Sequence, residues 1–254
     1  MRYGLIGEKL GHSYSKVIHE KIADYTYDLI PLSREEFKAF MNKKDFTAIN
    51  VTIPYKQAVI PYLDELDPLA KEIGAVNTIV NRQGHYIGYN TDFYGFMYML
   101  DHNGIRPKDK KCLILGSGGT SHTVSAVFRH LGASEVLIVS RQTSETTISY
   151  EECYAKHTDA QIIANTTPQG MYPNIDSSPL DLTTFTACEA VVDAIFNPLE
   201  TKLTRQAKLL GMKGVTGLEM LVAQAKQAIE YFLDTKLEDR VIEDTYQYLL
   251  KVIK

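Results

Sequence analysis

A lysine held at the end of a predicted strand is the first feature of this sequence that could do chemistry. Lys56 lies two residues after Pro54, which ends a β-branched run at residues 49–53 that is typical of a buried strand. Because proline fixes the backbone angle at the strand exit, it aims Lys56 in a defined direction. An ammonium held in this way can donate or accept a proton in general acid–base catalysis. The competing interpretation is that Lys56 begins a surface helix over residues 56–60.

Asp92 is the second charged candidate. It ends the run Gly88-Tyr-Asn-Thr-Asp92, at the start of a predicted helix over residues 91–102 that stops at Asn103-Gly104. A carboxylate at this point stabilises a helix N-terminus electrostatically, and the residues alone favour that interpretation over a catalytic one. The sequence by itself does not show that Asp92 meets Lys56.

A glycine-rich turn supplies the third signal, which is a nucleotide site. Gly116-Ser-Gly-Gly-Thr-Ser121 lies between a predicted strand at 112–115 and a helix to about residue 131, followed by a strand at 136–139. Glycines let the backbone approach a pyrophosphate closely, and the helix N-terminus attracts its charge. The pattern therefore predicts a dinucleotide-binding unit, with Ser121 in the place of the third small residue.

The residues after the second of these strands favour NADP over NAD. NAD-binding proteins tend to place an acid there for the ribose 2′-hydroxyl, whereas this chain has Ser140-Arg141. A guanidinium attracts a 2′-phosphate and stacks on adenine. The competing interpretation is that Arg141 is an ordinary surface cation.

The elements that must position these residues alternate between strand and helix, which predicts an α/β protein. Further strands are expected at residues 3–6, 27–30, 75–80, 86–89, 162–164, 190–194 and 214–215. Further helices are expected at 14–23, from a Ser33–Glu36 capping box to about 41, from 218 onward, and over about 238–253. The charged segment 105–111 is the predicted linker.

The composition excludes several classes of protein. The 254 residues are 44% hydrophobic and 23% charged, as in a globular protein of one or two domains. A net charge of −4 gives no electrostatic footprint for nucleic acid or an anionic membrane, and neither a signal peptide nor a membrane span is expected. Cys112, Cys153 and Cys188 are far apart, and His12 and His19 lack partners at metal-ligand spacing, so we expect a reducing, cytoplasmic compartment and no metal.

Eight motifs follow one another along the chain. They are Gly11-His-Ser13-Tyr-Ser15, Asn50-Val-Thr-Ile-Pro-Tyr-Lys56, Gly74-Ala-Val-Asn77-Thr, Asn90-Thr-Asp92, Gly116-Ser-Gly-Gly119, Asn165-Thr-Thr-Pro168-Gln-Gly-Met, Asn197-Pro-Leu-Glu-Thr and Gly217-Leu-Glu-Met-Leu-Val-Ala-Gln224. This ordered set is far more specific than a glycine-rich turn alone, and it resembles that of the shikimate dehydrogenase family from the first strand to the last quarter of the chain.

The resemblance implies reversible reduction of 3-dehydroshikimate to shikimate by NADPH, in the pathway to aromatic amino acids. Lys56 and Asp92 would form the catalytic pair, with Lys56 giving a proton to the ketone oxygen while the cofactor delivers hydride to carbon. The implied substrate-binding residues are Ser13 and Ser15 for the carboxylate, and Thr52, Asn77 and Gln224 for the ring hydroxyls. On the residues alone, Ser13 and Ser15 are ordinary loop hydroxyls, Asn77 is a turn amide and Gln224 is an exposed helix residue. The implied cofactor-binding residues are Gly116, Ser117, Gly118, Gly119, Thr120, Ser121, Arg141, Thr166, Thr167, Ala194 and Gly217.

The implied fold is α/β, with an N-terminal α/β substrate domain and a Rossmann-like doubly wound NADP-binding domain. The first domain would comprise residues 1–92 and the C-terminal helices at 217–254 that return to it, and the second would comprise residues 93–216. The implied partner is the small-molecule substrate, with no nucleic acid or membrane, and the implied assembly is a monomer or homodimer.

Four departures from the family pattern bear on specificity. Lys16 replaces a proline, Phe93 a glycine and Phe196 a tyrosine, while Glu145 takes the place of a second arginine at the cofactor site. The last of these weakens the NADP preference without reversing it. Two alternatives remain: a quinate/shikimate dehydrogenase that accepts NAD, and a catalytically silent nucleotide-binding regulator, which would not need both members of the catalytic pair.

Overall fold

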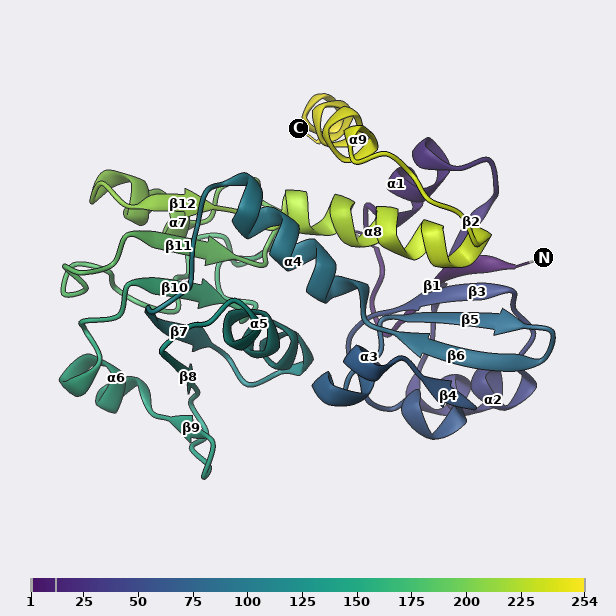
Figure 1. Ribbon diagram of the computed structural model, residues 1–254, viewed down its shortest axis with the longest axis horizontal. Coiled ribbons are helices and arrows are strands. Elements are labelled where there is room, and N and C mark those ends of the chain that lie inside the picture. Colours follow the sequence, from purple (N-terminus) through teal and green to yellow (C-terminus); the bar gives the residue numbers. More distant parts are fainter. Residues whose placement is uncertain (1, 12, 254) are drawn as a thin grey trace. The chain divides into compact units, whose positions relative to one another are not determined.

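The chain folds into two compact units. The computed structural model describes residues 2–11 and 13–253. Unit 1 comprises residues 2–95 and 221–253, and unit 2 comprises residues 96–220 (Figure 1). The chain therefore leaves unit 1 within helix α4 (Thr91–His102) and returns to it within helix α8 (Leu218–Leu233). The predicted linker at 105–111 lies inside unit 2.

Unit 1 is built on a mixed six-stranded sheet in the order β2-β1-β3-β5-β6-β4. β1 pairs in parallel with β2 and β3, whereas β5 pairs antiparallel with β3 and β6. The carboxyl ends of β1, β3 and β6 and the amino end of β5 therefore share one edge of the sheet. The strands are β1 (Tyr3–Gly7), β2 (Tyr27–Pro31), β3 (Ala48–Val51), β4 (Glu65–Leu66), β5 (Thr78–Arg82) and β6 (His85–Tyr89).

Both faces of this sheet are covered. Successive strand residues point to opposite faces, so Ile49 packs in one apolar cluster with Phe37 and Met41 of α2, while Ala48 packs in another with Phe232 of α8. The capping box forms as predicted, with Ser33 and Glu36 exchanging hydrogen bonds at the start of α2. The helices that lie wholly in unit 1 are α1 (Ser15–Ile22), α2 (Arg34–Lys43), α3 (Pro68–Ile73) and α9 (Arg240–Val252).

Unit 2 is built on a parallel six-stranded sheet in the order β12-β11-β10-β7-β8-β9. This is the strand order of doubly wound dinucleotide-binding folds, and it reverses between β7 and β10, where such folds bind their ligand. The predicted α/β class is confirmed. The strands are β7 (Lys111–Leu115), β8 (Glu135–Val139), β9 (Thr147–Ile148), β10 (Ile162–Asn165), β11 (Ala190–Asp193) and β12 (Lys213–Val215), and the helices wholly within the unit are α5 (Gly119–His130), α6 (Tyr150–Lys156) and α7 (Lys202–Leu209).

The segment around Lys56 differs from its prediction. The strand expected at 49–53 ends at Val51, because the backbone turns at Thr52, whose carbonyl accepts a hydrogen bond from Tyr55 N at 2.9 Å. Ile53 is consequently 70% exposed rather than buried. Lys56 lies in a turn ahead of a short 3₁₀ helix (Ile60–Tyr62), so the interpretation of residues 56–60 as a surface helix is wrong. The helix predicted over 91–102 is confirmed as α4.

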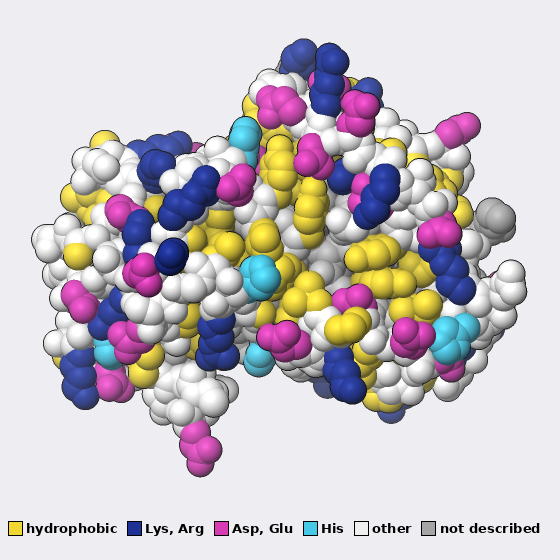
Figure 2. All heavy atoms as spheres, in the orientation of Figure 1, with side chains coloured by type: hydrophobic (Ala, Val, Ile, Leu, Met, Phe, Trp, Pro, Cys, Tyr) yellow, Lys and Arg dark blue, Asp and Glu magenta, His cyan; other side chains and the backbone are white. Residues whose placement is uncertain are grey.

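The surface carries charge of both signs. Figure 2 shows lysine, arginine, aspartate and glutamate side chains intermingled over the face in view, in keeping with the small net charge of −4. Within the described residues, no helix combines the length and apolarity that crossing a membrane requires.

Candidate active site and nucleotide site

Lys56 and Asp92 form an ion pair in unit 1, 36 positions apart in sequence. Lys56 Nζ lies 2.7 Å from Asp92 Oδ2, and the two side chains are 13% and 10% exposed. A pair so close and largely shielded from water interacts more strongly than a surface salt bridge. The ammonium retains enough exposure to reach a small molecule, and the carboxylate fixes its position. This is the geometry of a proton donor held ready for transfer.

The sheet topology explains why these two side chains meet. Lys56 follows the carboxyl end of β3, and Asp92 lies in the first turn of α4, directly after the carboxyl end of β6. Both ends lie at the same edge of the sheet, because the first residue of β5, Thr78, pairs with Asn50 on one side and Tyr89 on the other. The Lys56 carbonyl also accepts a hydrogen bond from Val76 N at 2.8 Å, which holds the turn against the segment that enters β5.

Two predicted ring-binding residues lie together at this edge. Asn77 and Gln224 are 3% and 8% exposed, and both contact Thr91 at the start of α4. Asn77 Oδ1 accepts from Thr91 N at 2.7 Å, Asn77 Nδ2 donates to Thr91 Oγ1 at 3.0 Å, and Thr91 Oγ1 donates to Gln224 Oε1 at 3.3 Å. Thr91 is a functional candidate that the sequence reasoning missed, although the Asn90-Thr-Asp92 motif contains it.

A buried series of hydrogen bonds holds the side chain of Asn77. Tyr27 OH donates to Asn50 Oδ1 at 2.7 Å, Asn50 Nδ2 donates to Thr78 Oγ1 at 3.0 Å, and Thr78 Oγ1 donates to Asn77 Oδ1 at 3.1 Å. Each member is at most 5% exposed, and burial holds the pKa of Tyr27 well above its usual value, so its hydroxyl keeps its proton. Such a fully bonded network fixes a side chain in one rotamer. The signal available in the sequence was Asn50, a polar residue inside an apolar strand.

The three predicted hydroxyl residues follow β1 or β3 in the sequence, and these two strands end at the edge of the sheet where Lys56 lies. Ser13 and Ser15 follow β1, and Ser13 Oγ accepts a hydrogen bond from Ser15 N at 3.3 Å. Thr52 follows β3, and its N donates to Ile6 O at 2.9 Å, which extends the pairing of the two strands by one residue. Within the part of the chain that the structure describes, hydrogen bonds do not join these hydroxyl residues to Lys56 or Asp92.

The two histidines of the N-terminal segment were predicted to be ordinary polar residues. His12 lies outside the described residues. His19 is fully buried, stacks on Tyr27 with ring centroids 4.0 Å apart, and has a pKa lowered to about 3 by burial, so it stays neutral. The described residues contain no cluster of ligands that could hold a metal ion.

The glycine-rich turn of unit 2 has the backbone that a nucleotide site requires. Gly116 adopts φ +100, a region open to glycine, and a Cβ there would lie only 2.9 Å from Thr167 Cγ2. Gly118 precedes α5 as an extended N-cap without a side-chain cap, and a Cβ there would meet nothing within 4 Å. Gly119 and Thr120 are the first two residues of α5, and the backbone N–H groups at the start of a helix can donate hydrogen bonds to a pyrophosphate.

A small polar pocket adjoins this turn. Its volume is about 320 Å³, and its lining consists mainly of hydroxyl side chains together with His122 and Gln142. Ser117 and Ser121 line it from the turn, and the Ser117 hydroxyl lies 3.1 Å from that of Ser140 at the end of β8. Hydroxyl groups of this kind suit the ribose and phosphate groups at the adenosine end of a dinucleotide. Arg141 is exposed just beyond β8 and is not part of the lining.

The remaining cofactor candidates follow the carboxyl ends of β10, β11 and β12. Thr166 Oγ1 donates to Leu115 O at 2.8 Å, which ties the loop after β10 to the glycine-rich turn. Ala194 directly follows β11, and a Cβ on Gly217 would lie 2.3 Å from Ala194 O. The structure thus brings the predicted residues of unit 2 to one edge of its sheet, as it does those of unit 1.

Asp193 is a buried carboxyl group at this edge that the sequence reasoning missed. It is fully buried at the last position of β11 and accepts hydrogen bonds from Ile195 N, Asn165 Nδ2 and Thr201 Oγ1. Burial raises its pKa to about 6 from a usual 3.8, against the lowering effect of these hydrogen bonds. Its sequence signal was an acid at the end of an apolar strand.

This raised pKa predicts a pH dependence of stability. Below about pH 4 the Asp193 carboxyl is protonated in both states, but as the pH rises from about 4 to 6 the unfolded chain loses that proton first. The contribution of Asp193 to stability is therefore lost over this window, and it is absent above pH 6. We expect the free energy of unfolding of wild type, minus that of Asp193→Asn, to be larger at pH 4 than at pH 7. Thermal unfolding at the two pH values measures this difference. An equal difference at the two pH values would contradict this.

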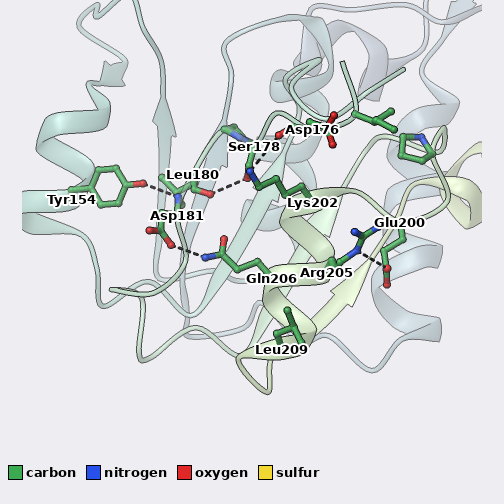
Figure 3. Close-up of a pocket in the computed structure, with 13 residues that line it drawn as sticks. Tyr154, Asp176, Ser178, Leu180, Asp181, Glu200, Lys202, Arg205, Gln206 and Leu209 are labelled. Carbon is green, nitrogen blue, oxygen red and sulfur yellow. Dashed lines mark hydrogen bonds and ion pairs between the residues drawn. The ribbon is translucent and has the colours of Figure 1, made fainter. Parts of the chain in front are cut away.

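A second pocket of unit 2 is larger than the one beside the glycine-rich turn. It has a volume of about 830 Å³, opens beside α7, and is shown in Figure 3. Several of its charged groups bond to their neighbours: Arg205 Nε lies 3.2 Å from Glu200 Oε2, and Asp181 Oδ1 accepts from Gln206 Nε2 at 2.6 Å. None of its lining residues is a predicted site residue, so size alone does not mark the site here.

Comparisons with known proteins bear on the family. Residues 5–79 match the model of the shikimate dehydrogenase substrate binding domain. The chain is 35% identical to the protein named shikimate dehydrogenase (NADP(+)) of Clostridium beijerinckii, with 96% of each chain covered. Among solved structures it is similar to a chorismate mutase/shikimate 5-dehydrogenase fusion protein from Clostridium acetobutylicum, with a TM-score of 0.91, 36% identity and coverage of 99% of this chain and 97% of that one.

A second solved structure carries ligands. It is shikimate 5-dehydrogenase from Thermus thermophilus in complex with NADP(H) and shikimate, which this chain matches with a TM-score of 0.86 and 28% identity, covering 98% of this chain and 99% of that one. The resemblance carried by the eight ordered motifs is thus matched by near-complete alignments in both sequence and structure. The chain belongs to the shikimate dehydrogenase family.

Proposed function

We propose that this chain is an oxidoreductase that reversibly reduces 3-dehydroshikimate to shikimate with NADPH, a step of aromatic amino acid biosynthesis. The observation that carries the proposal is the shielded pair of Lys56 and Asp92, 2.7 Å apart, at the edge where Asn77 and Gln224 also gather. A silent nucleotide-binding regulator would have no use for an ammonium positioned in this way. Family membership supports the same substrate and cofactor.

The substrate would be held by neutral hydrogen-bonding groups. Ser13 and Ser15 would bind its carboxylate, and Thr52, Asn77 and Gln224 its ring hydroxyls. Asn77 and Gln224 bond each other and Thr91 in the present structure, so their orientation is set before a ligand arrives. Pre-organised groups of this kind lose less entropy on binding.

Proton transfer would be the task of Lys56. When bound, NADPH supplies hydride to the ketone carbon. Negative charge then develops on the ketone oxygen, and Lys56 Nζ donates a proton to it; in shikimate oxidation the same nitrogen accepts the hydroxyl proton. Asp92 Oδ2 holds Nζ in place and stabilises its positive charge before the transfer.

The cofactor would be held by unit 2. The backbone from Gly116 to Thr120 and the start of α5 would bind the pyrophosphate, with Ser117 and Ser121 beside it. Arg141 would bind the 2′-phosphate, and Thr166, Thr167, Ala194 and Gly217 would hold the other half of the cofactor. The three free cysteines are buried, which fits a reducing compartment, and we propose a cytoplasmic monomer or homodimer.

A spectrophotometric assay that follows the absorbance of the reduced nicotinamide tests the proposal. We expect the purified chain to reduce NADP⁺ rapidly with shikimate, and more slowly with quinate or with NAD⁺. Comparable rates with quinate and NAD⁺ would identify it instead as a quinate/shikimate dehydrogenase. Activity with none of the four pairs of substrate and cofactor would contradict the proposed function.

Arg141 gives a prediction about cofactor choice. We expect Arg141→Ala to weaken NADPH binding by about tenfold and NADH binding much less, because the contact with the 2′-phosphate is lost only for NADPH, whereas lost stacking on adenine affects both nucleotides. Fluorescence titration of each nucleotide measures both constants. Arg129→Ala, at the exposed C-terminal end of α5, is the matched control. Equal weakening of NADPH and NADH would show that Arg141 does not read the phosphate.

A further inference from the structure

Asp193 is a carboxyl group that is fully buried and has no cationic partner within residues 2–11 and 13–253. Among the described residues, its hydrogen-bond donors are neutral: Asn165 Nδ2 and Ile195 N, each 3.0 Å from Oδ1, and Thr201 Oγ1, 2.8 Å from Oδ2. Burying an acid among neutral groups is costly, and an apolar residue at the end of β11 would avoid that cost. The donors come from the end of β10, from the residues directly after β11 and from the start of α7, so the carboxyl group joins these three parts of unit 2, which an apolar side chain could not do.

The first arm of this cluster reaches the loop after β10. Asn165 donates to Asp193 with its Nδ2, and its Oδ1 accepts from Thr167 N at 2.9 Å and Thr167 Oγ1 at 2.7 Å. Because the amide of Asn165 is held from the Asp193 side, its oxygen is aimed at Thr167. Thr167 in turn packs against the glycine-rich turn, where a Cβ on Gly116 would lie 2.9 Å from Thr167 Cγ2.

The second arm reaches the end of β12. Ile195 N donates to Asp193, and Ile195 O accepts from Gly217 N at 2.8 Å. Gly217 passes so close to Ala194 that only a hydrogen fits in place of a side chain. The third arm is Thr201, which caps α7: its Oγ1 also accepts a hydrogen bond from Thr204 N at 3.3 Å.

We propose that Asp193 is a positioning residue for the cofactor site. Its carboxyl group fixes the relative positions of the segments that contain Thr167, Ala194 and Gly217. The inference rests on the proposed function, because these segments matter only if they hold a nucleotide. Asp193 does not itself touch the cofactor. It acts through Asn165 and Ile195, and its loss disorders the loops that they anchor.

Two substitutions separate this role from simple packing. Asp193→Ala leaves the donors of Asn165 and Ile195 unpaired, and we expect it to weaken NADPH binding by about tenfold or more. Asp193→Asn keeps an oxygen for both donors, and its amide can donate to Thr201 Oγ1 if that hydroxyl turns to Thr204 Oγ1, 3.2 Å away. We therefore expect Asp193→Asn to restore binding to within about threefold of wild type at pH 7.5.

The readout is equilibrium binding of two ligands, measured without turnover. NADPH is titrated by fluorescence, and shikimate, whose proposed site lies in unit 1, by calorimetry. We expect Asp193→Ala to lose NADPH affinity and to keep shikimate affinity, a split that general destabilisation would not produce. Asp159→Ala, an exposed carboxylate ahead of the other end of β10, is the control and should bind both ligands normally.

Several outcomes would overturn the inference. Wild-type NADPH affinity in Asp193→Ala would do so, as would equal loss of both ligands, or a loss that Asp193→Asn fails to restore. If Asp193→Ala does not fold, Thr201→Val and Thr201→Ser replace it, since only the serine keeps the hydroxyl that reaches Oδ2; equal NADPH affinity in these two would then overturn it. A wild-type chain that binds no NADPH is a different result, because it contradicts the proposed function itself and the inference with it.

Discussion

Replacing Lys56 with alanine should lower kcat for shikimate oxidation by about 10²- to 10⁴-fold, while KM for shikimate changes by less than about tenfold. The reason is that proton transfer occurs in the transition state, whereas the ground-state substrate is held mainly by the hydroxyl and amide side chains at the same edge. Steady-state kinetics at saturating NADP⁺ separates the two constants. Unchanged kcat would remove Lys56 from the mechanism.

Two further variants make the Lys56 result interpretable. Lys56→Ala leaves the largely buried Asp92 without its partner, which can destabilise the chain. Thermal unfolding of the variant, with and without NADPH, shows whether lost activity reflects lost structure. Lys71→Ala, at the exposed end of α3, removes a lysine of the same unit and should leave both constants at their wild-type values. Lys56→Arg keeps a charge beside Asp92, yet it should stay slow because a guanidinium gives up its proton poorly.

Long, regular helices could be predicted from the sequence. The ends of short elements depend on contacts with residues distant in sequence, which the local pattern of apolar residues does not encode. The helix at 91–102 has a clear start and a glycine stop, and it forms as predicted. The strand predicted at 49–53 extends two residues beyond the observed end of β3, because β-propensity contains no information about where the neighbouring strand ends. β1 ends at Gly7, and beyond Thr52 the chain turns toward Tyr55.

Three short helices, α3, α6 and α7, escaped the sequence reasoning although each carries a capping signal. Asp67 accepts from Leu69 N, Ser149 from Glu152 N, and Thr201 from Thr204 N. Helices of six to eight residues offer too few turns for an apolar period to stand out. Their caps were local evidence for them, and a search for Ser, Thr or Asp ahead of a short helical run would have found them.

The composition of the site was accessible from motifs, but its geometry was not. Lys56 and Asp92 meet because β3 and β6 both pair with β5, a fact of strand order that neither residue encodes. The supports of the site were harder still to foresee. Tyr27 and Asn50 are 23 positions apart, and a polar residue inside an apolar strand gives no indication of which partner satisfies it. Asp193 was missed for the same reason.

Replacing Asp92 with asparagine should lower kcat by about 10- to 100-fold, less than the loss of Lys56 itself, because the proton donor remains but is no longer held by an opposite charge. Asparagine can still accept the hydrogen bond from Lys56 Nζ, but it leaves the largely buried ammonium without an opposite charge, so we expect a loss of stability of about 1–3 kcal/mol. Asp101→Asn, at the other end of the same helix and exposed, is the matched control. A large loss of stability with unchanged kcat would assign Asp92 to the helix terminus alone.

The double variant decides whether the two residues act as one unit. If Asp92 works only by holding Lys56 Nζ, it has nothing left to hold once Lys56 is alanine. The variant that carries both Lys56→Ala and Asp92→Asn should then be no slower than Lys56→Ala alone, so the two losses should be strongly non-additive. Losses that multiply would mean that Asp92 contributes independently, for example by a direct contact with the substrate. The 2.7 Å separation of Nζ and Oδ2 favours the first outcome, because residues in direct contact have effects that depend on each other.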